Sequence, residues 1–138
     1  MISVLVDTNI FIDVFGPPNP LRNWSARQLA IRKGEVQFVL SPIVWAELAG
    51  MQASEADLTA LLARLDLVRE ALPFSAAYEA ERAPLGYRRS GGVRERTLPD
   101  FFIGAHAQLK SHHLLTRDGA RYRSYFPDVE LICPETHP

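Results

Sequence analysis

The sequence predicts a single α/β domain covering residues 1–138, with helices on both faces of a central, mainly parallel sheet. Short runs of β-branched and other apolar residues alternate with longer segments of helical character, and this alternation is typical of parallel sheets. Turn or helix-capping residues stand where one kind of segment changes into the other. With 138 residues, of which 47% are hydrophobic, the chain is long enough to bury a core.

The strands are predicted from apolar runs without polar alternation, because a strand of a parallel sheet is covered on both faces. The run ISVLV near the start of the chain is the clearest of them, and Asp7 ends it. Later runs are separated by intervals that leave room for helices. The predicted strands are residues 2–6, 36–40, 66–69, 113–116 and 129–132.

The helices are predicted from apolar residues at helical spacing and from residues that favour helix starts. Ser41-Pro42 is the strongest start signal, with serine as the cap and proline in the first turn. Thr8, Ser54 and Ser75 are candidate caps of the same kind. The predicted helices are residues 8–15, 22–33, 42–50, 54–65, 75–85 and 99–110, and the Gly- and Arg-rich segment 86–97 is predicted as a loop.

Four acidic residues stand at the ends of predicted elements. Asp7 follows the first strand, Glu47 lies in the helix after the second, Asp100 opens a helix and Asp118 follows the fourth strand. Ligands of open α/β sheets bind beyond the carboxyl ends of the strands, so we expect these carboxylates at one edge of the sheet. Clustered carboxylates repel one another unless a cation or protons neutralise them, and a hard divalent ion suits such oxygen ligands. Each of the four, taken alone, is also explained as a turn, helix-start or packing residue.

Basic residues are concentrated in one part of the chain, although the net charge is only −1. Residues 82–123 hold nine basic and three acidic residues, so this segment carries +6 and the remainder −7. Thirteen of the fifteen cations are arginine, whose planar guanidinium binds phosphate in a fork. The segment fits a polyanionic substrate. An Arg-rich solvated surface is the equally supported alternative.

Other candidate residues carry weaker signals. The lone Cys133 excludes an internal disulfide and multi-cysteine zinc sites. His106, His112 and His113 lack a recognisable ligand spacing, so we expect structural or surface histidines, and we expect Asp13 to be a packing or surface carboxylate. The sequence has no signal-peptide pattern and no apolar run of about 20 residues. We therefore expect a cytoplasmic protein that does not enter a membrane.

Four segments together resemble a known family. They are VLVDTNIFIDVF, SPIVWAELAG, LPDFFIGAHAQL and LLTRDGARYRSYFP. In this order they resemble the PIN-domain nucleases, and more closely the VapC-type toxins of VapBC toxin–antitoxin pairs. The resemblance covers residues 2–134 and implies a three-layer α/β/α PIN-like fold.

The resemblance also implies roles for particular residues. The four acidic residues named above take the places of the family's four acidic positions, which implies that they are catalytic and bind Mg²⁺ or Mn²⁺. Glu47 is the first candidate to act through water rather than directly on the ion. The residues expected to contact substrate or the surroundings of the ion are Asn9, Arg88, Arg89, Thr116 and Arg117. The family further implies cleavage of RNA, often tRNA or rRNA, a homodimer, and silencing by a small VapB-like antitoxin.

The expected reaction is hydrolysis of RNA phosphodiester bonds, in which a divalent ion activates water and neutralises charge on the phosphoryl oxygens. Three alternatives stay open. A housekeeping PIN-type RNA-processing nuclease would have no antitoxin, and a non-catalytic RNA-binding module would tolerate the loss of Asp7. An aspartate-nucleophile phosphotransferase would phosphorylate Asp7. Such enzymes commonly carry a second Asp two residues later, where this chain has Asn9.

Overall fold

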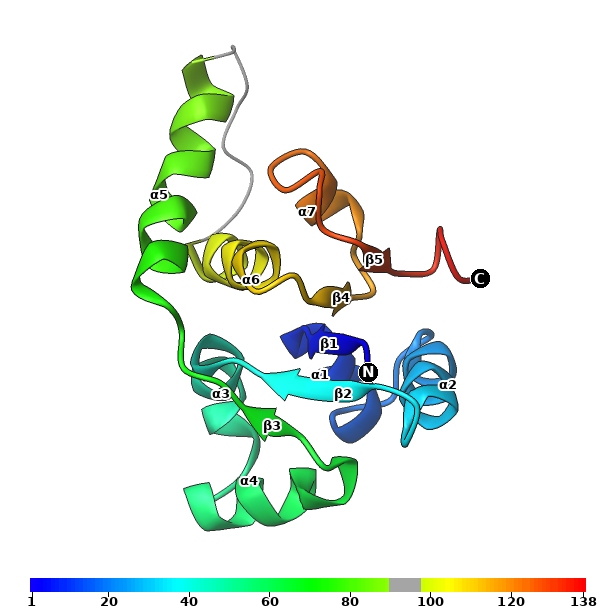
Figure 1. Ribbon diagram of the computed structural model, residues 1–138. Helices are drawn as coiled ribbons and strands as arrows, with labels where there is room; N and C mark the ends of the chain where they lie inside the picture. Colours follow the sequence, from blue (N-terminus) through cyan, green and yellow to red (C-terminus); the bar gives the residue numbers. More distant parts are fainter. Residues whose placement is uncertain (90–97) are drawn as a thin grey trace.

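A fully parallel five-stranded sheet forms the centre of the molecule, in the strand order β3-β2-β1-β4-β5 (Figure 1). The structure is a computed structural model that describes residues 1–89 and 98–138, with the side chains of residues 84–89 left out. The predicted α/β class with a parallel sheet is confirmed. The strands are β1 (Ser3–Val6), β2 (Gln37–Leu40), β3 (Val68–Arg69), β4 (His113–Leu115) and β5 (Leu131–Ile132).

The helices connect these parallel strands and cover the sheet. Right-handed crossovers place the helices between β1 and β3 on one face and those between β3 and β5 on the other, because the strand order reverses direction after β3. Most of the packing agrees: α1 packs against α2 and α3, and α6 packs against α5 and α7, while α3 also contacts α6. The helices are α1 (Thr8–Phe15), α2 (Arg22–Arg32), α3 (Pro42–Leu48), α4 (Glu55–Leu62), α5 (Phe74–Arg89), α6 (Leu98–Leu109) and α7 (Ala120–Arg123), with 3₁₀ turns at Ala49–Met51 and Ala63–Leu65.

The core lies on both faces of the sheet. Val4, Leu5 and Val6 of β1 are completely buried, as expected for the central strand of a parallel sheet. On the α6 face, a Cβ atom added to Gly104 would lie 2.3 Å from the ring of Phe126. A glycine is therefore required where α6 meets the segment after α7. Among the described residues, no helix is both long enough and apolar enough to cross a membrane.

Helix starts follow the sequence predictions with two corrections. The side chains of Ser41 and Ser54 accept hydrogen bonds from the first turns of α3 and α4, as predicted. Thr8, however, does not cap α1; Asp7 does, because its carboxylate accepts from the Thr8 N–H at 2.7 Å. Ser75 does not cap α5 either. The helix begins at Phe74, one residue earlier, and the carbonyl of Pro73 accepts its first hydrogen bonds.

The end of α5 differs from the prediction. The helix was expected to end near residue 85, but it continues to Arg89, so the first residues of the predicted loop 86–97 are helical. A physical reason is that a single glycine such as Gly86 costs a helix only about 1 kcal/mol, and Arg88 and Arg89 after it favour a helix. The rest of the predicted loop, residues 90–97, lies outside the described residues. The four-residue helix α7 was not predicted, since it is too short to show a hydrophobic period.

Candidate functional site

Three of the four acidic residues line one pocket, which we call the acidic pocket. Its volume is about 150 Å³. Asp7 follows β1, Glu47 lies on α3 and Asp100 lies in the first turn of α6, so three separate elements bring the carboxylates together. The lining residues are Asp7, Thr8, Asn9, Ile12, Glu47, Asp100 and Arg121.

Asp7 is the most firmly held of the carboxylates. It is buried, and its Oδ1 accepts from the Thr8 N–H at 2.7 Å. Its Oδ2 accepts from the hydroxyl groups of Tyr122 at 2.8 Å and Thr116 at 2.9 Å. Its own N–H donates to the carbonyl of Leu115 in β4. The carboxylate is therefore fixed in position by contacts from the end of β4, from the start of α1 and from α7.

The acidic pocket is short of positive charge around Asp7. Burial raises the pKa of Asp7 to about 6, and the charge of Asp100 adds to this shift, whereas the hydrogen bonds from Tyr122, Thr116 and the Thr8 N–H oppose it. Burial and the charge of Asp7 also raise the pKa of Tyr122 well above its usual range, so this phenol stays protonated and donates. A cation near Asp7 would favour the ionised carboxylate.

The remaining acidic residues are arranged around Thr8 and Arg121. Glu47 is exposed, and its Oε1 accepts from the Thr8 hydroxyl at 2.6 Å. Arg121 Nη1 lies 3.4 Å from the Asp100 carboxylate, and its Nε lies 2.6 Å from that of Asp118. Burial lowers the pKa of Arg121, but the charges of Asp100 and Asp118 outweigh this and raise it. Asp118 thus joins the acidic pocket through Arg121 and does not itself line it.

Asn9 and Thr116, both expected near the ion or substrate, form a hydrogen-bonded network with Asp7. The Asn9 side-chain amide donates to Thr116 at 3.2 Å and to Asp7 at 3.3 Å. Thr116 is completely buried, and its hydroxyl also accepts from the Asp118 N–H at 3.1 Å. Asn9 Oδ1 accepts from the Arg117 N–H at 3.2 Å. These contacts hold the loop after β4 against the start of α1.

The arginines expected to contact substrate are placed differently. The guanidinium of Arg117 is paired with the buried Asp13 at 2.9 Å. Asp13 also accepts from the Ser25 hydroxyl at 2.7 Å, which agrees with a packing role. The backbone of Arg88 and Arg89 belongs to α5, but their side chains lie outside the described residues.

The acidic pocket fits a hydrated hard cation. Its donors are carboxylate, hydroxyl and amide oxygens, the ligands that Mg²⁺ and Mn²⁺ prefer. Within the described residues, however, no three of these carboxylates offer oxygens that all lie within 4.8 Å of one another; Glu70, His106 and His112 form the one group of that kind. Mg²⁺ keeps several waters and needs few direct protein ligands, so the wider spacing suits binding partly through water.

Sequence reasoning missed several of these residues. Arg121 stands three residues after Asp118, where a helix would place both on one face, but the helix itself was not predicted. No sequence pattern around Tyr122 indicates that its side chain contacts Asp7. Glu70 was not singled out either, although its carboxylate joins His106 and His112, which were expected to be structural or surface histidines.

Comparisons with known proteins agree with the fold. Several solved structures share it: VapBC2 from Rickettsia felis bound to a promoter DNA fragment (17% identity, 96% of this chain and 98% of that chain, TM-score 0.72); DNA-bound VapBC from Salmonella typhimurium (17%, 96% and 98%, 0.70); and VapC20 from Mycobacterium tuberculosis, described as a sarcin-ricin loop cleaving toxin (18%, 93% and 99%, 0.67). At these identities the likeness is one of fold. Among proteins of curated function, none matches the chain significantly.

The family model for the PIN domain matches residues 4–126. The matched region includes β2, β3 and β4, all of β1 except Ser3, and all four acidic positions. The resemblance inferred from the four sequence segments is thereby confirmed. This chain belongs to the PIN-domain family.

Proposed function

We propose that this chain is a metal-dependent endoribonuclease that acts as the toxin of a type II toxin–antitoxin pair. The observation that carries the proposal is the acidic pocket, where Asp7, Glu47 and Asp100 converge from three elements of a PIN domain. The fold shared with VapC toxins supports the same function. The reaction would be hydrolysis of RNA phosphodiester bonds.

The residues of the pocket have distinct roles in this proposal. Asp7 and Asp100 would bind Mg²⁺ or Mn²⁺ directly. Glu47 and Asp118 would bind the ion through bridging water molecules. When bound, the ion activates water and neutralises charge on the phosphoryl oxygens. Tyr122, together with Thr116 and Asn9, keeps Asp7 oriented by donating to its carboxylate.

Arg121 is the best placed cation for a substrate phosphate. It lines the acidic pocket, and its side chain is 41% exposed while contacting Asp100 and Asp118. Once a divalent ion neutralises those carboxylates, the guanidinium is available to a phosphate oxygen. Arg88 and Arg89 remain proposed phosphate contacts. Arg117 is better explained as the partner of the buried Asp13.

The partners in this proposal follow from the fold neighbours. The structures that share the fold include VapBC complexes bound to DNA, and this supports a small VapB-like antitoxin as partner. VapC20 is described as cleaving the sarcin-ricin loop, which supports a structured cellular RNA, rRNA or tRNA, as substrate. A homodimer and a cytoplasmic location complete the proposal.

Cleavage of total cellular RNA tests the activity, with Mg²⁺, Mn²⁺ or EDTA present. Asp100→Asn should lower the initial rate at least about 100-fold, because it removes a direct oxygen ligand, whereas Glu47→Gln should lower it about 10-fold if Glu47 acts through water. The matched control is Asp128→Asn, an exposed carboxylate away from the pocket, which should cut like the wild type.

Two results would overturn the assignment. RNA cleavage that continues unchanged in EDTA would show that the reaction does not depend on a metal ion. Equal cleavage by the wild type and Asp100→Asn would show that the acidic pocket does not take part in the reaction. Expression of the chain with its neighbouring reading frames tests the antitoxin separately: a small protein that co-purifies and stops cutting supports a toxin, and unaltered cutting without such a partner supports a housekeeping nuclease.

A further inference from the structure

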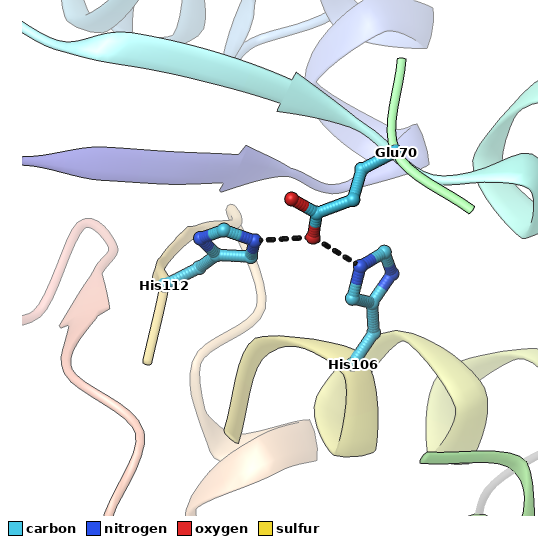
Figure 2. A group of neighbouring side chains, drawn as sticks. All are labelled: Glu70, His106 and His112. Carbon is cyan, nitrogen blue, oxygen red and sulfur yellow. Dashed lines mark hydrogen bonds and ion pairs between the residues drawn. The ribbon is translucent and has the colours of Figure 1, made fainter. Parts of the chain in front are cut away.

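Glu70, His106 and His112 form a second cluster, which we call the His–Glu cluster. Glu70 follows β3, His106 lies on α6 and His112 precedes β4. Figure 2 shows the Glu70 carboxylate between the two imidazole rings, with its Oε1 2.7 Å from each Nε2 atom. Among the described residues, this is the one group of three or more such side chains whose ligand atoms all lie within 4.8 Å of one another.

The donor set of the His–Glu cluster differs from that of the acidic pocket. Two imidazole nitrogens and one carboxylate oxygen suit Zn²⁺ and related transition ions, whereas Mg²⁺ prefers oxygen alone. Both histidines are buried, and the Glu70 side chain is 25% exposed. A surface hollow of about 290 Å³ includes Glu70 among its lining residues. Glu70 is therefore the member of the cluster that reaches this hollow, which neither histidine lines.

One histidine already has the outer contact that metal ligands need. A histidine that binds a metal through Nε2 carries its proton on Nδ1 and donates it to a fixed acceptor. His112 Nδ1 lies 2.6 Å from the Ser3 hydroxyl. The buried Nδ1 of His106 has no hydrogen-bond partner among the described residues. Glu70 and His112 are therefore expected to hold an ion most firmly.

We propose that Glu70, His106 and His112 form a binding site for a Zn²⁺-like transition-metal ion, separate from the acidic pocket. Bonds of about 2.1 Å in a tetrahedral site place ligand atoms about 3.4 Å apart, so the Glu70 oxygen, now 2.7 Å from each Nε2 atom, has to withdraw by about 0.7 Å from each ring. Glu70 is the partly exposed member of the cluster and can make this movement. The ion would join α6 to the strand segments on either side of the sheet centre.

Visible absorption of Co²⁺ tests this site in the whole chain. The protein is freed of metals and then titrated with Co²⁺ in excess Mg²⁺, which occupies oxygen-only sites. One equivalent of Co²⁺ should give the intense bands of a four- or five-coordinate site with nitrogen ligands, and one equivalent of Zn²⁺ should remove them. Glu70→Gln and His112→Gln should abolish the bands. Ser3→Ala should weaken Co²⁺ binding about 10–100-fold, because it removes the outer contact of His112.

Two control variants locate the signal. His113→Gln changes the adjacent histidine, which is not part of the cluster, and Asp118→Asn changes the acidic residue paired with Arg121; both should keep the bands. The absence of bands in the wild type, or bands of equal intensity in Glu70→Gln, would overturn the proposal and leave the cluster as a purely hydrogen-bonded contact. If His112→Gln does not fold, the partly exposed Glu70→Gln variant decides the outcome.

Discussion

The acidic pocket and the His–Glu cluster are both made of ionisable side chains, but their charges are balanced in opposite ways. In the acidic pocket, carboxylates face one another, and burial with the charge of Asp100 raises the pKa of Asp7 to about 6. In the His–Glu cluster, burial also works against the Glu70 anion. There, the hydrogen bonds from His112 and His106 outweigh burial and lower the pKa of Glu70.

The difference shows what each cluster requires. The acidic pocket has more carboxylates than cations around it, with Arg121 as the cation among its lining residues. It gains most from a hard divalent ion that neutralises oxygen ligands. The His–Glu cluster is already satisfied by imidazole donors, so an ion there has to replace hydrogen bonds and needs strong nitrogen ligation to do so. Both clusters can therefore be tested through stability as well as through metal binding.

The largest expected effect is a pH dependence that comes from Asp7 in the metal-free protein. Its folded pKa of about 6 lies above the unfolded value of 3.8, so the folded state binds more protons between these values and stability falls as pH rises through them. The shift corresponds to about 3 kcal/mol. Chemical denaturation from pH 4 to pH 8 should show that wild type loses most of this, about 2.4 kcal/mol, relative to Asp7→Asn, which cannot ionise. Parallel curves for the two proteins would contradict the raised pKa.

A smaller effect is expected for Tyr122→Phe, which sharpens the contrast between ionised and neutral Asp7. The lost hydroxyl donates to the Asp7 carboxylate at 2.8 Å. A hydrogen bond to a charged group stabilises by about 2 kcal/mol, and one to a neutral acid by about 1 kcal/mol. Unfolding in EDTA should therefore show a larger loss at pH 8 than at pH 5. Tyr78→Phe, at an exposed position, is the control and should change little at either pH; an equal loss for Tyr122→Phe at both pH values would indicate a packing effect alone.

The smallest expected effect is that of Glu70→Gln in EDTA. The substitution removes the charge that accepts two imidazole N–H groups, at a cost of about 1 kcal/mol at pH 7. Because the folded pKa of Glu70 is lowered, its contribution is present above the unfolded pKa of 4.5 and is lost as pH falls through the folded pKa. The difference from wild type should shrink below about pH 4.5, as measured by denaturant midpoints. A difference that grows at acid pH would contradict this account.

Much of the fold could be predicted from local sequence. The apolar run before Asp7 predicted the central strand, and Ser41-Pro42 predicted the start of α3. The alternation of strands with helices likewise predicted the parallel sheet. Helix α5 was one exception, since it continues past the predicted end at residue 85 to Arg89; one glycine does not stop a helix when the residues after it favour one. The short helix α7 was another.

The candidate site was predictable in part. Parallel strands present their carboxyl ends at one edge, and for that reason sequence position alone predicted that Asp7, Glu47 and Asp100 would approach one another. The position of Asp118 was less determined. A turn residue can point in several directions, and in the structure it lies against Arg121.

Apart from the short helix α7, the sequence by itself determined the succession of strands and helices along the chain, the parallel sheet and the edge at which the acidic residues stand, because these follow from hydrophobic pattern and from the geometry of crossover connections. Only the tertiary structure decided that Tyr122 donates to Asp7, 115 residues away, and that Glu70 lies between His106 and His112. Such contacts depend on how side chains from distant elements meet in three dimensions. No spacing along the chain encodes them.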